Sequence, residues 1–254
     1  MNQHKVASVR PVSVVPLEGI PELHEADDLA GELHEAATRA GGLQLGDVVV
    51  VAQKAVSKVE GRVVRVADIE PSERARELAG ADGDPRQLEV ILRESVRVVR
   101  SRPPLVIAET RHGFVCASAG VDASNAPEGT LVLLPLDPDA SARRLRERLL
   151  ALSGADVGVI VSDSFGRPWR QGTTDVALGV AGIAALRDLR GSRDAAGHVL
   201  RTTQIAVADE IAGAAELVLG KASGVPAAIV RGVDVRGDGR GDELVMPPER
   251  DLFR

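Results

Sequence analysis

The sequence is poor in the residues on which several common kinds of protein chemistry depend. It has a single cysteine, Cys116, which excludes an internal disulfide and a thiolate metal cluster. Aromatic residues make up only 2% of the chain and tyrosine is absent, so a platform of stacked rings for single-stranded nucleic acid is not expected. No apolar run approaches the length of about 18 residues that a transmembrane helix needs, and the N-terminus lacks the apolar core of a signal peptide. We therefore expect a cytoplasmic protein without a membrane partner.

Several catalytic motifs are also missing. The chain has no GxxxxGK[ST] phosphate loop, no GxSxG nucleophile elbow, and no GxGxxG after a predicted strand. The five histidines are scattered, and the start of an HExxH zinc motif at His34 fails because Thr38 stands where the second histidine should be. The net charge of −6 argues against general nucleic-acid binding, so an anionic ligand should meet a local cationic pocket.

What the chain does contain is an alternation of short apolar runs and helical patterns, typical of a mixed α/β (α+β) protein. Predicted strands cover residues 12–15, 48–52, 105–109, 114–117, 131–134, 157–161, 202–207 and 226–230. Predicted helices cover residues 27–40, two segments between 71 and 102, 140–152 and 208–220. The strand–helix–strand unit over 131–161 favours parallel pairing of its two strands. We expect one domain over residues 1–254, with a soft lobe boundary near 130.

The chain is organised around residues 157–172, which read VGVIVSDSFGRPWRQG. A buried strand is followed at once by polar residues, and open α/β sheets place their ligands at such strand ends. Asp163 with its neighbouring hydroxyls offers the oxygen ligands that magnesium or manganese prefers, and Arg167 and Arg170 suit phosphate or carboxylate. Alternatively, Asp163 and Ser164 only cap the next segment and the arginines are solvated.

Residues near other predicted strand ends also have one functional and one purely structural interpretation. Lys54 and Lys58 follow a buried strand in a predicted loop, where they either contact phosphates or are solvated. Asp122 and Asn125 provide either a metal carboxylate and an amide donor or an Asx turn. The proline-bracketed loop at 16–21 either brings backbone N–H groups to a ligand or only connects two elements. Together this inventory suits phosphoryl transfer, in which cations neutralise developing charge.

Five groups of motifs follow one another along nearly the whole chain. They are PLEGIPEL with the following DDL, GDVVVVAQKAVSKVEGR, AGVDASNAPEG with PLDPD, VSDSFGRPWRQG, and VADEIAGAAELVLG with PAAIVRG. In this order and spacing they resemble the coenzyme F420-0:L-glutamate ligases, the GTP-dependent γ-glutamyl ligases of the deazaflavin coenzyme. The resemblance implies a two-lobed, mixed-sheet, non-Rossmann fold that forms a homodimer. Some relatives carry a further flavin-binding domain; because this chain stops at Arg254, we expect a stand-alone ligase domain.

The resemblance also implies a set of site residues. The nucleotide contacts it implies are Glu18, Gly19, Ile20, Pro21, Gln53, Lys54, Lys58 and Asn125, completed by Thr203 and Gln204 in the stretch up to Ala208. The metal ligands it implies are Asp122 and Asp163, with Ser164 on a second ion where many relatives have threonine. Two divalent ions, Mg²⁺ or Mn²⁺, are expected, and K⁺ is a further candidate. We expect Asp122, Asp163 and Arg170 to be catalytic, with Arg167 and Arg170 facing the acidic substrate.

The reaction that the resemblance implies joins L-glutamate to coenzyme F420-0. GTP would activate the terminal carboxylate of the acceptor as an acyl phosphate, and GDP and phosphate would be released. Repetition would build a γ-linked glutamate tail. Two other hypotheses remain at this point: a nucleotide- and metal-binding regulatory module without turnover, and the same ligation on a different acidic acceptor. The retention of Asp122, Asn125, Asp163 and Lys58 counts against the regulatory module.

Overall fold

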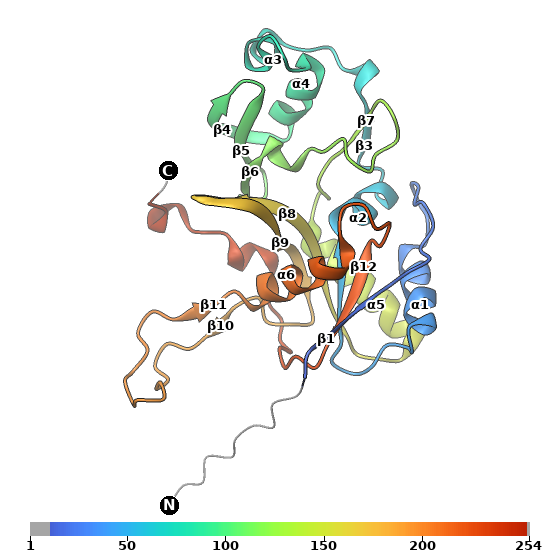
Figure 1. The fold of residues 1–254 in the computed structure, drawn as a ribbon, viewed down its shortest axis with the longest axis vertical. Coiled ribbons are helices and arrows are strands. Elements are labelled where there is room, and N and C mark those ends of the chain that lie inside the picture. The colour runs from blue at the N-terminus through green and yellow to red at the C-terminus, as the bar shows by residue number, and fades with distance from the viewer. Residues whose placement is uncertain (1–10, 253–254) are drawn as a thin grey trace, which may run out of the picture.

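The computed structural model describes residues 11–252, and a five-stranded mixed sheet forms its centre (Figure 1). The strand order is β1 (Ser13–Pro16), β12 (Ala227–Arg231), β2 (Val48–Ala52), β8 (Gly158–Arg167) and β9 (Arg170–Ala181). Among the strand pairs of residues 11–252, only β2 and β8 are parallel, with Val48 opposite Gly158 and Ala52 opposite Ser162. Strand β2 ends at Ala52, whereas β8 continues to Arg167, so the residues after Ala52 lie beside the part of β8 that follows Ser162.

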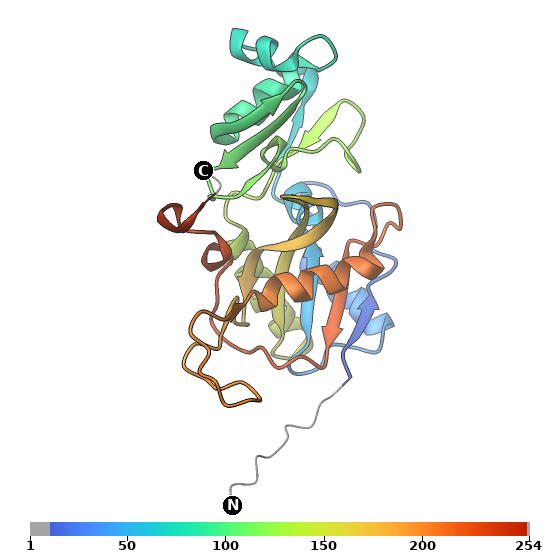
Figure 2. The same cartoon turned by 60° about the vertical axis from the view of Figure 1, so that its left-hand side comes forward.

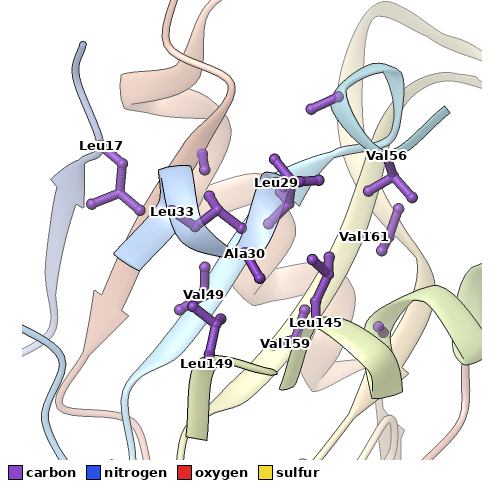
Figure 3. Close-up of a cluster of buried hydrophobic side chains, with 14 of the residues drawn as sticks. Leu17, Leu29, Ala30, Leu33, Val49, Val56, Leu145, Leu149, Val159 and Val161 are labelled. Atoms are coloured by element: carbon purple, nitrogen blue, oxygen red, sulfur yellow. The ribbon is translucent and has the colours of Figure 1, made fainter. Parts of the chain in front are cut away.

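Helices cover both faces of this sheet. Helices α1 (Leu29–Arg39), α2 (Gln53–Val59) and α5 (Pro138–Ser153) lie on one face, and α6 (Val207–Leu219) lies on the other. Figure 3 shows Leu29 and Leu33 of α1 and Leu149 of α5 packed around Val49 of the sheet. The alternate strand residues face α6 instead and are equally buried. Burial on both faces explains why these strands are continuous apolar runs.

The helix ends follow the capping signals in the sequence. The Asp28 carboxylate accepts the N–H of Gly31 at 3.1 Å where α1 begins. The Asp137 carboxylate accepts the N–H of Ala140 at 2.8 Å where α5 begins, and α5 ends at Gly154 in the left-handed conformation with φ of 71°. Aspartate at the N-cap and glycine just beyond the C-terminus satisfy backbone groups that the helix itself leaves unpaired.

Residues 63–134 form a smaller part that is inserted between α2 and α5 and lies beyond one edge of the large sheet (Figures 1 and 2). The chain enters through β3 (Val63–Arg65) and returns through β7 (Thr130–Val132), which pair with each other. Between them lie two helices, a three-stranded antiparallel sheet and two short 3₁₀ turns: η1 (Val66–Asp68), α3 (Glu73–Ala79), α4 (Pro85–Arg93), β4 (Ser95–Arg102), β5 (Leu105–Thr110), β6 (Val115–Ala117) and η2 (Ser118–Gly120). This part has its own buried core.

Two further segments extend from the large part. Strands β10 (Arg187–Asp188) and β11 (Gln204–Ile205) pair at the base of a projecting arm (Figure 1). The C-terminal segment contains two 3₁₀ turns, η3 (Gly241–Leu244) and η4 (Pro248–Arg250). Within the described part of the chain, no helix is both long and apolar enough to cross a membrane.

Four sequence-based expectations about local structure are wrong. The strand predicted over residues 157–161 does not end before Asp163 but continues as β8 to Arg167, because residues 162–167 pair with β9. Lys54 and Lys58 lie on the short helix α2 and not in a loop. The predicted second helix stops at Arg93, and residues 95–102 form β4, because their alternation of valine and polar residues also fits a strand that can pair with β5. Strand β7 pairs with β3 and not with β8, because β2 already occupies the parallel position beside β8.

Candidate functional site

A cavity of about 460 Å³ lies where β2 ends beside the continuing strand β8, between the large part and the inserted part. Its lining includes Gln53 and Lys54 from the start of α2, and Asp163 and Ser164 from β8. The inserted part contributes residues 116–118 and 120–122 together with Asn125. Six of the residues singled out in the sequence therefore meet in one cavity: Gln53, Lys54, Asp122, Asn125, Asp163 and Ser164.

Lys54 connects the two parts of the molecule across this cavity. Its ammonium donates to Asp122 Oδ2 at 2.6 Å, to the Ser124 carbonyl at 2.9 Å and to Ser124 Oγ at 2.6 Å. Burial of the Asp122 carboxyl opposes ionisation, but hydrogen bonds from Lys54 and Ser124 outweigh it, so the pKa of Asp122 is lowered. The site therefore holds an ionised carboxylate beside a positive charge that is mostly shielded from water.

Asp163 has the opposite electrostatic character. Burial raises the pKa of its carboxyl to about 7, and the nearby carboxylates of Asp175 and Asp122 act in the same direction. The N–H of Ser164 and the charge of Lys54 oppose this shift without cancelling it. A cation placed beside such a carboxyl would favour its ionised form. A strongly shifted acid in a cavity is also a common mark of a functional site.

Two further acidic residues, Asp175 and Glu216, accept hydrogen bonds from the serine hydroxyls on either side of Asp163. Ser162 Oγ donates to Asp175 Oδ2 at 2.9 Å, and Ser164 Oγ donates to Asp175 Oδ1 at 2.6 Å. Glu216 of α6 accepts the backbone N–H of Asp175 at 2.9 Å and lies 3.4 Å from Ser164 Oγ. Sequence reasoning missed Asp175 and Glu216. A prediction of the β8–β9 hairpin would have found Asp175, because it stands directly opposite Ser164 in the register.

Two amide side chains line the cavity from opposite sides. Gln53 is buried; its Oε1 accepts from Ser57 Oγ at 2.9 Å, while its Nε2 has no hydrogen-bond partner among the described residues. Asn125 has a left-handed backbone with φ of 54°, and its Nδ2 donates to the Lys221 carbonyl at 3.1 Å. Lys221, just past the end of α6, lines the cavity as well, and the sequence reasoning had not selected it.

The remaining predicted residues do not line this cavity. The loop containing Glu18, Gly19, Ile20 and Pro21 follows β1 at the same edge of the sheet, because the N–H of Leu17 donates to the carbonyl of Ala227 at 2.9 Å. Lys58 pairs with Glu22, which joins α2 to that loop. Arg167 and Arg170 are exposed at the turn between β8 and β9. Thr203 and Gln204 lie at the base of the projecting arm.

The oxygen atoms in the cavity fit hard divalent cations by their chemistry. Asp122, Asp163 and Ser164 supply two carboxylates and a hydroxyl, and Asp175 adds a further carboxylate to the same lining. Among residues 11–252, however, no group of three or more His, Cys, Asp or Glu side chains is arranged to hold a metal ion. The metal ligands named from the sequence thus remain a prediction.

Comparisons with known proteins agree on one family. Residues 19–232 match the family model described as F420-0:Gamma-glutamyl ligase. The chain is 46% identical over 250 residues to the coenzyme F420:L-glutamate ligase of Methanopyrus kandleri, covering 96% of this chain and 97% of the relative. It is 44% identical to the proteins of the same name from Methanothermobacter thermautotrophicus, with 96% and 99% covered, and Archaeoglobus fulgidus, with 96% of both covered.

Proposed function

This chain belongs to the F420-0:gamma-glutamyl ligase family and is an enzyme of the ligase class, and from that premise we propose that it joins L-glutamate to coenzyme F420-0 with GTP as cosubstrate. The observation that supports GTP use most directly is the contact of Lys54 with Asp122 beside Asp163 in one cavity. A shielded ammonium next to carboxylates that suit divalent cations is an arrangement that favours a triphosphate and its metal ions.

We propose that the reaction proceeds through an acyl phosphate. A carboxylate oxygen of the acceptor attacks the γ-phosphorus of GTP, and the bond from that phosphorus to the β-phosphate oxygen breaks to release GDP. The glutamate nitrogen then attacks the acyl carbon, inorganic phosphate leaves with its bonding electrons, and the nitrogen loses a proton. The product is an amide. Because water would hydrolyse the acyl phosphate, the reacting groups must be enclosed, and a cavity between two parts of the chain suits this need.

Eight residues of the cavity have a role in this proposal. Lys54 contacts the phosphates, and the unpartnered Gln53 Nε2 donates to the nucleotide together with Asn125. Asp122, Asp163 and Ser164 would hold the divalent ions, and Asp175 and Glu216 position the Ser164 hydroxyl. Magnesium or manganese bound there would neutralise charge on the β- and γ-phosphates.

The exposed hairpin turn has a separate proposed role. Arg167 and Arg170 lie beyond Ser164 on the same hairpin, and we propose that they attract the acidic substrates toward the cavity. A homodimer, with the nucleotide in a groove near the subunit contact, also belongs to the proposal.

If Arg170 attracts the acidic substrates, its substitution by alanine should raise the KM values for glutamate and for F420-0. Unchanged KM values would show that Arg170 has no part in substrate binding.

Mass spectrometry of the products tests the proposed function directly. Purified protein is incubated with F420-0, L-glutamate, GTP and Mg²⁺ or Mn²⁺, and Asp163→Ala is assayed alongside. We expect mass increments of successive glutamyl units with stoichiometric GDP, and a loss of at least about 100-fold in the variant. Asp82→Ala is the matched control, because Asp82 is an exposed aspartate outside the cavity lining.

The other outcomes separate the alternative functions. GTP binding without hydrolysis or product would favour the regulatory module. GTP turnover that another acidic acceptor stimulates, with F420-0 unmodified, would favour ligation on that acceptor. Product formed equally well by Asp163→Ala would show that the cavity is not the reaction site.

A further inference from the structure

A second cavity, of about 520 Å³, lies on the other side of Phe165 from the candidate active site. Its walls come from β6 and the turn before it, the β8–β9 hairpin, and the C-terminal segment after Gly241. Most of the lining is apolar and includes Phe114, Phe165, Val176, Leu244 and Met246. The volume falls within the range of about 300–1,000 Å³ that is usual for small-molecule sites, and the mainly apolar lining is typical of them.

Two of the few aromatic residues of the chain line this cavity. The whole sequence has three phenylalanines, one tryptophan and no tyrosine, yet Phe114 and Phe165 both line the same space. Their ring centroids are 6.2 Å apart in an edge-to-face arrangement, and His112 stacks on Phe114 at 5.5 Å. Such a wall is suited to a flat aromatic ligand, which gains both apolar burial and ring contacts.

The rim of the cavity exposes apolar surface that a ligand would cover. Met246 is 51% exposed and Val115 is 39% exposed, and both belong to the lining. Asp209 and Arg250 add polar groups to the wall, and the Asp209 carboxylate is fixed by the N–H of Ala177 at 2.9 Å. A few polar groups in an apolar cavity orient a ring system that has polar edge atoms.

Phe165 connects the two cavities, because its side chain belongs to the lining of both. It follows Ser164 directly in β8, so the apolar cavity begins one residue beyond the proposed metal ligands. A ligand with a flat ring at one end and an acidic chain at the other could therefore place the ring in the second cavity and the acid in the first.

We propose that the second cavity binds the deazaflavin ring of the acceptor, while the acidic chain of the acceptor passes Phe165 to reach Lys54 and Asp163. This assignment rests on the proposed function, because that function supplies an acceptor with a ring and a carboxylate. It makes Phe114 and Met246 determinants of acceptor specificity that have no part in binding GTP.

The test uses Phe114→Leu, which keeps an apolar side chain but removes the flat ring, and Met246→Ala at the exposed rim. Leu217→Ala is the control, since Leu217 is 86% exposed on α6 and outside the cavity. Two quantities are measured in each protein. One is the pair of KM values for F420-0 and GTP. The other is the Kd of a truncated ligand, the deazaflavin that carries only its ribityl chain and has neither phosphate nor lactate. Its binding is measured by the change in its fluorescence.

We expect Phe114→Leu to raise both the KM for F420-0 and the Kd of the ribityl compound by about tenfold, with the KM for GTP unchanged. Met246→Ala should act in the same direction by a smaller factor, and Leu217→Ala should change neither value. If Phe114→Leu lowers the melting temperature, Met246→Ala still tests the ring site, because Met246 lies at the exposed rim.

Unchanged ring affinity in both variants would overturn the proposal, even with a fully active ligase. A shift in oligomeric state in sedimentation equilibrium, with acceptor affinity unchanged, would show that a second copy of the chain covers the cavity, which also overturns it. A third outcome separates the two proposals. If both variants weaken binding of the ring but the protein forms no glutamyl product, the ring site is supported and the proposed ligation is not.

Discussion

Ser162 and Ser164 show how neighbouring residues of one type can differ in role. Both hydroxyls donate to the carboxylate of Asp175, at 2.9 and 2.6 Å. Ser162 is completely buried, so in the folded protein water cannot replace its hydrogen bond to Asp175. Ser164 is partly exposed in the cavity and also approaches Glu216 at 3.4 Å. We therefore assign Ser162 to the stability of the hairpin and Ser164 to the chemistry of the cavity.

Alanine at these two positions should separate stability from activity. Ser162→Ala leaves Asp175 with an unsatisfied oxygen in a buried position, and we expect a loss of about 1–3 kcal/mol in the free energy of unfolding. Ser164→Ala should cost less stability but lower kcat by at least about tenfold, and Ser164→Thr should retain activity because the hydroxyl is kept. Urea unfolding and GDP release measure the two effects. Full activity in Ser164→Ala would exclude a role for this hydroxyl in the reaction.

At the scale of elements, one carboxylate ties two helices of the inserted part together. Glu89 of α4 accepts the backbone N–H of Ser72 at 3.0 Å, and Ser72 is the residue that caps α3. Hydrogen bonds from the Ser72 side chain and backbone, and then from Arg93, lower the pKa of Glu89 from 4.5 to about 2. The pairing of α3 with α4 therefore depends on an ionised Glu89.

This arrangement predicts a dependence of stability on acid. A carboxyl whose pKa is lowered by folding stabilises the protein above the unfolded-state value of 4.5, and that stabilisation is lost as the pH falls toward about 2. Glu89→Gln should thus cost about 1–2 kcal/mol at pH 7 and progressively less below pH 4.5. Urea unfolding of both proteins at pH 7, 4 and 3 measures the difference. A cost that stays constant over this range would contradict the assignment.

At the scale of the whole molecule, the proposed site depends on how two parts of the chain are held together. Lys54 and Asp163 belong to the large part, whereas Asp122 and Asn125 belong to the insertion. Arg62 lies at the junction, where its Nε donates to the Leu134 carbonyl at 2.9 Å and its Nη2 pairs with Glu94 at 2.7 Å. Both side chains of that ion pair are largely buried.

Arg62→Ala should loosen the inserted part relative to the large part. We expect a lower melting temperature and a several-fold higher KM for GTP, although Arg62 lies outside the cavity lining, because Lys54 and Asp122 would be less firmly apposed. Arg74→Ala is the control: Arg74 and Glu77 are both 60% exposed, and such a surface pair contributes little. A melting temperature that falls with no change in the KM for GTP would show that the junction affects stability alone.

The sequence was informative wherever a signal is local. Continuous apolar runs identified β2, β8 and β12, and capping residues located α1 and α5, because these patterns depend on near neighbours. The insertion of residues 63–134 and the pairing of β2 with β8 depend on contacts between distant segments, which no local pattern encodes.

The candidate site was predictable to a similar degree. Lys54 comes just after the buried strand β2 and Asp163 just after the buried half of β8, and polar residues behind these two apolar runs were visible in the sequence. Asp175, Glu216 and Lys221 reach the cavity only through the hairpin register and the packing of α6, so their distance along the chain concealed them. Thr203 and Gln204 were placed by resemblance alone, and the structure shows them on the arm, away from the cavity lining.

The order of strands in the large sheet also determines when this protein can fold. Strand β12 lies between β1 and β2, so β1 lacks its only sheet neighbour, and β2 lacks the neighbour on one side, until Arg231 has been made. Until then their apolar edges remain unpaired, and pairings between such distant segments form slowly. The insertion, by contrast, is contiguous in sequence and has its own core, so it can fold on the ribosome first. The parts that meet at the candidate site are thus completed at different times, and the cavity between them is among the last features of the molecule to form.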